Sequence, residues 1–85
     1  MSKQDIWLRI LKERQRQDTK FGSQRKLTQQ EWLTILVEEV GEVAESILEG
    51  DIPNYPVELI QVAAVCVAAI ECWESNKVVR DEEAG

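Results

Sequence analysis

The chain has 85 residues, which is enough for one small domain and too few for two. Hydrophobic residues make up 44 % of it and charged residues 31 %, an ordinary globular composition that argues against a disordered or fibrous chain. Sixteen Asp and Glu against ten Lys and Arg give a net charge of −6. A nucleic acid is therefore not the expected partner, because binding to a phosphate backbone requires a basic surface.

The composition also limits where in the cell the protein is expected and which side chains are available for catalysis. The N-terminal residues lack the apolar core of a secretory signal, and no uncharged apolar run reaches the roughly 18 residues that span a bilayer. We therefore expect a soluble, cytoplasmic protein with no membrane partner. Cys66 and Cys72 fall in one predicted helix about 9 Å apart, too far for a disulfide within that helix, so both are expected to be free thiols. Histidine is absent, so any chemistry must use carboxylates.

Basic and acidic side chains are separated along the chain. Residues 1–26 contain eight basic and three acidic side chains, whereas residues 27–76 contain ten acidic and no basic ones. The acidic segment is also the most apolar, so we expect it to fold and to hold a site. The single domain is thus divided into a basic N-terminal helix and loop (1–26), an acidic and apolar helix pair (27–76) and a charged tail (77–85).

Three helices are predicted in chain order. The first spans residues 4–19, with apolar side chains on one face of its first two turns. Thr28 and Glu31 form a capping-box pattern that opens the second helix, and Gly50 marks its end. The third begins with Asn54 as its cap and Pro56 in its first turn, and it runs to about residue 75. No segment alternates with the period of a strand, so the predicted fold class is all-α.

The third predicted helix is apolar on nearly every face between residues 57 and 73. Such a helix must be surrounded, and two short neighbours from the same chain cannot cover it. We therefore expect a homo-oligomer, a dimer or a tetramer, in which the three-helix protomer forms a four-helix-bundle core with a second subunit.

The second predicted helix has a stripe of carboxylates on one side. On a helical wheel Glu38, Glu42, Glu45 and Glu49 lie within about 60° of one another, and Glu39 lies at the border of the apolar face. A solvated surface would explain such a stripe, but like charges at this spacing repel and no Lys or Arg is interleaved. A hard divalent cation, Mg²⁺ or alternatively Mn²⁺, would offset the repulsion. Spacing alone leaves both interpretations open.

Two pairs of residues have the spacing needed to share an ion. Glu39 and Glu42 lie three residues apart toward the inner side of the second helix, and Glu58 and Gln61 have the same spacing at the polar start of the third. Carboxylate and amide oxygens are ligands that Mg²⁺ accepts.

The run Glu38-Glu39-Val40-Gly41-Glu42-Val43-Ala44-Glu45 resembles the EExxE signature of the MazG-like, all-α nucleoside triphosphate pyrophosphohydrolases. The segment Glu58-Leu59-Ile60-Gln61 lies where that family has ExxD. The segment from Glu13 to Gly22 is similar to the family's stretch before the signature, which often ends Lys-Trp-Gly. The resemblance covers about two thirds of the chain. It departs at Gln61, where the family has an aspartate, so metal affinity or turnover is expected to suffer.

The resemblance implies an activity and a set of roles. The family cleaves (d)NTP between the α and β phosphates to a monophosphate and pyrophosphate, and so clears or regulates nucleotide pools. Metal ligands would be Glu39, Glu42 and Glu58, with Gln61 as a weaker, uncharged fourth. Glu38 and Glu45 would join Glu39 and Glu42 as catalytic residues by assisting the attack of water on phosphorus. Contacts to the substrate phosphates would come from Arg16 and Lys20. Phe21 has two interpretations that stay open, a residue that stacks on the base or an apolar plug that closes the first helix.

Two other functions remain to be separated from this enzyme. One is a non-catalytic helical module that binds a partner or a nucleotide through its acidic surface, with no metal held by the glutamates. The other is a carboxylate-bridged di-iron bundle, which is disfavoured because such bundles use ExxH pairs and the chain has no histidine.

Overall fold

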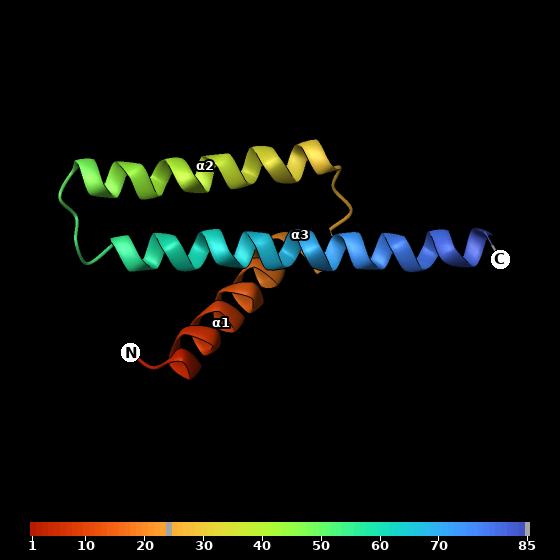
Figure 1. Ribbon diagram of the computed structural model, residues 1–85, viewed down its shortest axis with the longest axis horizontal. Coiled ribbons are helices and arrows are strands. Elements are labelled where there is room, and N and C mark those ends of the chain that lie inside the picture. The colour runs from red at the N-terminus through yellow and green to blue at the C-terminus, as the bar shows by residue number, and fades with distance from the viewer. Residues whose placement is uncertain (24, 85) are drawn as a thin grey trace.

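The computed structural model describes the backbone of residues 1–23 and 25–84 and the side chains of residues 1–23 and 25–76. These residues form three helices, α1 (Lys3–Phe21), α2 (Gln29–Leu48) and α3 (Tyr55–Ala84), with no strand among them. α2 and α3 lie side by side and antiparallel, and α1 crosses α3 obliquely (Figure 1). The all-α class is confirmed. The pairing with a second subunit remains a prediction.

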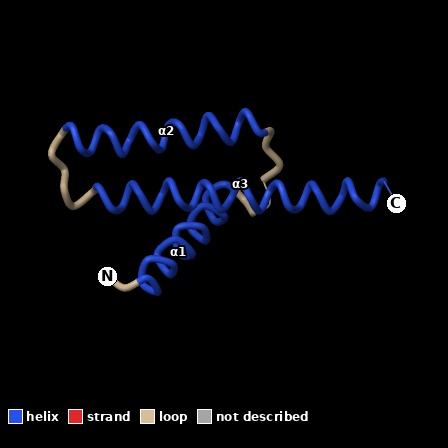
Figure 2. The backbone as a smooth tube through the Cα atoms, in the orientation of Figure 1, coloured by secondary structure: helices blue, strands red, loops and turns tan. Residues whose placement is uncertain are grey.

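Figure 2 shows where each helix gives way to a loop, and short polar signals in the sequence set these ends. Thr28 Oγ1 accepts a hydrogen bond from the Glu31 amide at 3.1 Å while Glu31 accepts one from the Thr28 amide, so the predicted capping box is confirmed. Ser2 and Asp5 form an equivalent box at the start of α1. Gly50 has a φ of 68°, a left-handed conformation that glycine adopts at little cost after a helix.

The third helix differs from its prediction at its far end. Asn54 precedes its first residue as expected, and its carbonyl accepts the Glu58 amide at 3.0 Å. The helix then continues to Ala84, so the prediction that it stops near residue 75 before a frayed tail was wrong for the backbone of residues 77–84. That stretch contains no proline or glycine to break the helix. The side chains of the predicted tail, and Gly85 altogether, lie outside the described residues.

The buried core is small and centres on α3. Trp32 of α2 packs with Val65, Ala68 and Cys72, and Leu27, Ile35, Leu36 and Ala69 lie against this cluster. α1 contacts α3 but not α2 within the described chain. α3 is therefore the central element, with α2 running along it and α1 crossing it (Figure 1).

Much apolar surface remains exposed in the single chain. On α2 the side chains of Leu33, Val37, Val40 and Ile47 are each at least 50 % exposed, and their spacing places them on one face. On α3 Ile70 and Trp73 are also exposed. A stretch of α3, Tyr55–Asn76, is long and apolar enough to cross a membrane by length and composition, a test that the central helix of a water-soluble bundle also passes. Cys66 and Cys72 are both free, as expected.

Candidate metal centre

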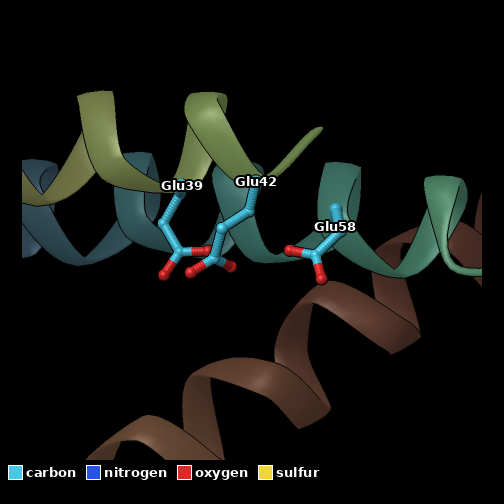
Figure 3. Close-up of side chains that lie close together, drawn as sticks. All are labelled: Glu39, Glu42 and Glu58. Carbon is cyan, nitrogen blue, oxygen red and sulfur yellow. The ribbon is translucent and has the colours of Figure 1, made fainter. Parts of the chain in front are cut away.

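Three glutamates from two helices converge between α2 and α3. Glu39 and Glu42 lie one turn apart on α2, and Glu58 lies in the first turn of α3. Each offers a carboxylate oxygen, and the three oxygens lie within 4.8 Å of one another. In Figure 3 the three carboxylates point toward one another between α2 and α3, with α1 passing alongside. The connector between α2 and α3 reverses the chain, so the start of α3 lies beside α2. Glu58 is therefore close in space to Glu39 and Glu42, although it is separated from them in the sequence.

The proximity of the carboxylates makes it costly for all of them to ionise. The pKa of Glu39 is raised above its ordinary value, first by burial and then by the negative charges of Glu58 and Glu13. The pKa of Glu42 is raised as well, chiefly by a hydrogen bond to Glu58 and by the charge of Glu39. Such a cluster holds a proton, a cation or a hydrogen-bond donor to offset the repulsion.

Gln61 supplies one such donor. With its amide oriented to suit its neighbours, Nε2 donates to Glu58 Oε2 at 2.9 Å and to Glu39 Oε2 at 3.2 Å. Gln61 thus joins the two helices across the cluster. The structure brings it to the site that the spacing predicted, with its nitrogen rather than its oxygen facing the carboxylates.

The oxygens are nearly close enough for one Mg²⁺. Oxygen ligands lie about 2.1 Å from this ion, so any two of them are at most about 4.2 Å apart. The observed span of up to 4.8 Å would have to close by about 0.6 Å, which small side-chain rotations accomplish. Three carboxylates also leave coordination positions for water and substrate phosphate, the usual arrangement for Mg²⁺ in proteins. The donor set therefore fits Mg²⁺ or Mn²⁺.

Arg16 lies beside this cluster, and its predicted contact with phosphate remains a prediction. Its positive charge opposes the rise in the pKa of Glu39, so the two groups interact through space. The guanidinium is held by Glu13, with Arg16 Nη2 2.6 Å from Glu13 Oε1. Sequence reasoning did not select Glu13, although it sits one turn before Arg16 on the same face and its side chain is only 13 % exposed. The three-residue spacing between Glu13 and Arg16 was the feature of the sequence that could have identified Glu13.

The other predicted catalytic residues lie at the rim. Glu38 and Glu45 are exposed and outside the group of three. The charge of Glu45 contributes to the raised pKa of Glu42, which places Glu45 near the cluster. No such interaction connects Glu38 to the three glutamates in the described chain. The helix turns Glu38 and Glu45 away from α3, because they lie on the outer side of the same stripe.

Lys20 and Phe21 lie farther along α1, at its C-terminal end. Phe21 is exposed, with the Lys20 ammonium 5.0 Å and the Arg25 guanidinium 4.8 Å from its ring centre. Neither residue contacts the carboxylates within the described chain. Arg25 also covers the Trp32 ring at 4.9 Å and lines a cavity of about 390 Å³ between the first connector and α3. Lys20 and Phe21, the predicted phosphate and base contacts, thus lie on the same helix as Arg16 but do not reach the glutamate cluster.

Comparisons of the chain with family models, with curated proteins and with solved structures return no match.

Proposed function

We propose that the chain is a Mg²⁺-dependent nucleoside triphosphate pyrophosphohydrolase of the MazG-like, all-α type. The observation that carries the proposal is the convergence of Glu39, Glu42 and Glu58 from two helices to within 4.8 Å. A solvated stripe would not need Glu39 to turn inward with a raised pKa, because exposed carboxylates lower their energy by separating in water. The EExxE-like run and the position of Glu58 support the same assignment.

In this proposal Glu39, Glu42 and Glu58 hold the ion, which would neutralise charge on the phosphoryl oxygens and orient the triphosphate. Arg16 and Lys20, on the facing helix, offset the remaining negative charge. Glu45 lies near Glu42 and accepts the proton of the attacking water, with Glu38 as the other candidate base. The bond between the α phosphorus and its bridging oxygen breaks, which gives a (d)NMP and pyrophosphate. The expected role is clearance of nucleotide pools in the cytoplasm.

The proposal includes a homo-oligomer. Leu33, Val37, Val40 and Ile47 form an exposed apolar face on α2, and Ile70 and Trp73 expose further apolar surface on α3. Water contact with this much apolar surface is unfavourable, and a second copy packing α2 and α3 against their equivalents would bury it in a four-helix core. The active form is then a dimer or a pair of dimers, with no nucleic acid and no membrane as partner.

The test is a product assay. The purified protein is incubated with each canonical (d)NTP and Mg²⁺, and the released phosphate species is identified as pyrophosphate or orthophosphate. Pyrophosphate is expected, with Mn²⁺ able to replace Mg²⁺ and EDTA abolishing release. Titration calorimetry with Mg²⁺, Mn²⁺ and a non-hydrolysable dNTP supplies the second readout, and silence in every combination removes the enzyme proposal.

A non-catalytic module is the second candidate, and the position of Gln61 favours it. The Gln61 amide already donates to Glu39 and Glu58, so it satisfies part of the cluster without a cation. In such a module the acidic surface would bind a partner or a nucleotide without turnover. Nucleotide binding with no product formed, or metal-independent binding of a basic partner, would support this candidate.

A further inference from the structure

A basic groove lies next to the glutamate cluster, between α1 and the start of α3. It encloses about 280 Å³ and is lined on the α1 side by Arg9, Lys12, Glu13 and Arg16. The α3 side consists of Val57, Ile60 and Gln61. Gln61 is shared with the cluster, because the same amide donates to Glu39 and Glu58. The groove and the carboxylates are therefore contiguous.

Two of the three cations in the groove have no acidic partner within the described chain. Arg16 is paired with Glu13. Arg9 contacts only the Met1 sulfur, at 3.4 Å, and Lys12 makes no ion pair among the described residues. Positive side chains that face one another without a counter-charge repel, and an anion placed between them removes the repulsion. The groove thus has the charge and the free donors needed to hold an anion.

The shape and lining of the groove favour an inorganic phosphate chain over a nucleobase. No aromatic side chain lines it, so it offers no stacking surface. The nearest aromatic ring on the same helix after the row of cations is Phe21, beyond Lys20. At 1.5 Å per residue the row Arg9, Lys12, Arg16 and Lys20 extends about 17 Å along one face of α1. At the Arg9 end of this row the groove therefore offers cations but no stacking surface.

We infer that Arg9 and Lys12, with Arg16, form the subsite for the terminal phosphates of the substrate, the part that leaves as pyrophosphate. The inference rests on the proposed function, and it assigns Arg9 and Lys12 a role that the sequence pattern did not. A triphosphate with one Mg²⁺ retains net negative charge, which these cations neutralise beside the carboxylates. A mononucleotide lacks the phosphates that the subsite holds, so its binding does not depend on the two residues.

The test compares pyrophosphate with a mononucleotide in the double variant Arg9→Gln/Lys12→Gln. Glutamine keeps much of the aliphatic stem beside Val57 and Ile60 and removes the charge. In Mg²⁺ buffer, calorimetry is expected to show pyrophosphate binding weakened by about tenfold, in line with the loss of two charge-assisted contacts at a partly exposed site. The affinity for Mg²⁺ alone and for a (d)NMP should stay within about twofold of the unmodified protein.

Two further variants separate the subsite from general electrostatics. Lys3→Gln removes one charge from an exposed position in the first turn of α1, outside the groove, and should leave pyrophosphate binding unchanged. Lys12→Arg keeps the charge and should retain affinity. If the double variant does not fold by circular dichroism, Lys12→Gln alone decides, because Lys12 is exposed and its loss should still weaken pyrophosphate binding about threefold.

The outcomes distinguish the subsite from the enzyme. Unchanged pyrophosphate binding in the double variant, or an equal loss for pyrophosphate and (d)NMP, overturns the subsite and leaves the proposed function standing. An unmodified protein that binds neither Mg²⁺ nor pyrophosphate overturns the proposed function and the subsite together.

Discussion

Arg14 of α1 and Glu71 of α3, 57 residues apart in the chain, form a two-point ion pair. Arg14 Nε donates to Glu71 Oε1 and Arg14 Nη2 to Glu71 Oε2, each at 3.0 Å. Two further donors of the buried guanidinium reach Gln17 and Asp18. The hydrogen bond to Glu71 is the main cause that raises the pKa of Arg14. Since α1 contacts α3 but not α2 among the described residues, this pair helps set where α1 lies beside the glutamate cluster.

Replacing Glu71 by glutamine should destabilise the fold modestly. The change leaves the Arg14 guanidinium with Asp18 and Gln17 but without its two-point partner. The Glu71 side chain is 55 % exposed, so solvent screening limits the expected loss to about 1 kcal/mol of unfolding free energy. Urea denaturation measures it. Glu74→Gln is the matched control, since Glu74 is exposed and has no ion pair in the described chain, and an equal loss there would refute a specific role for the pair.

Glu42→Gln should separate stability from function. The neighbours Glu58 and Glu39 raise the pKa of Glu42, so removing its charge relieves repulsion and should raise the metal-free melting temperature by a few degrees. The same change removes one ligand, so pyrophosphate release should fall by at least about a hundredfold while the oligomer mass stays unchanged. Calorimetry, melting curves and the product assay test these effects. Retained activity would take Glu42 out of the mechanism.

The metal-free protein should lose stability as the pH rises above about 4.5. Glu39 and Glu42 have folded-state pKa values raised above 4.5, so their stabilising contribution is complete below that pH and is lost as the pH passes through the raised values. The lowered pKa of Asp5 acts in the opposite sense, but only near and below its ordinary value of 3.8. The chain has no histidine, so no imidazole titrates in this pH range and masks the effect of the two glutamates.

Melting temperatures in EDTA across this pH range check the sign. Saturating Mg²⁺ should reverse the trend, because the ion requires ionised carboxylates and binds more tightly at higher pH. The double variant Glu39→Gln/Glu42→Gln should show neither the loss in EDTA nor the gain with Mg²⁺. A stability in EDTA that increases with pH would contradict the raised pKa values.

Gln61→Asp should tighten metal binding and weaken the metal-free fold. The aspartate brings a fourth negative charge to the site and cannot donate to Glu39 and Glu58 as the amide does. We expect Mg²⁺ affinity to increase by about tenfold and the melting temperature in EDTA to fall. Gln61→Asn is the matched control, with the length of aspartate and no charge. Weaker Mg²⁺ binding in Gln61→Asp than in Gln61→Asn would show that the amide has a role of its own.

Val37→Glu should dissociate the proposed oligomer. Val37 is 60 % exposed in the single chain and lies on the same apolar face as Leu33, Val40 and Ile47. A charge buried there without a partner would be costly in an interface and harmless in a monomer. Light scattering coupled to gel filtration should give a multiple of the chain mass for the unmodified protein and the single mass for the variant. Thr34→Glu, exposed but off this face, should keep the oligomer mass.

Local patterns in the sequence predicted the three helices and marked acidic residues that meet in the structure, but not the far end of α3. The Thr28 and Glu31 capping box and the left-handed Gly50 depend on residues close in the chain, so both could be predicted. The spacing of Glu39 and Glu42, and of Glu58 and Gln61, likewise marked the residues that meet in the structure. Spacing along one helix could not show that Glu38 and Glu45 lie outside the group of three.

The sequence by itself determined an all-helical chain with an acidic second helix and the residues that could hold an ion, because helix periodicity and capping act over a few residues. Only the tertiary structure decided which carboxylates meet, that the Gln61 nitrogen faces them, and that Glu13 and the groove of Arg9 and Lys12 lie beside them. These relations depend on how α1 and α2 pack on α3, and long-range packing sets distances that no local spacing contains.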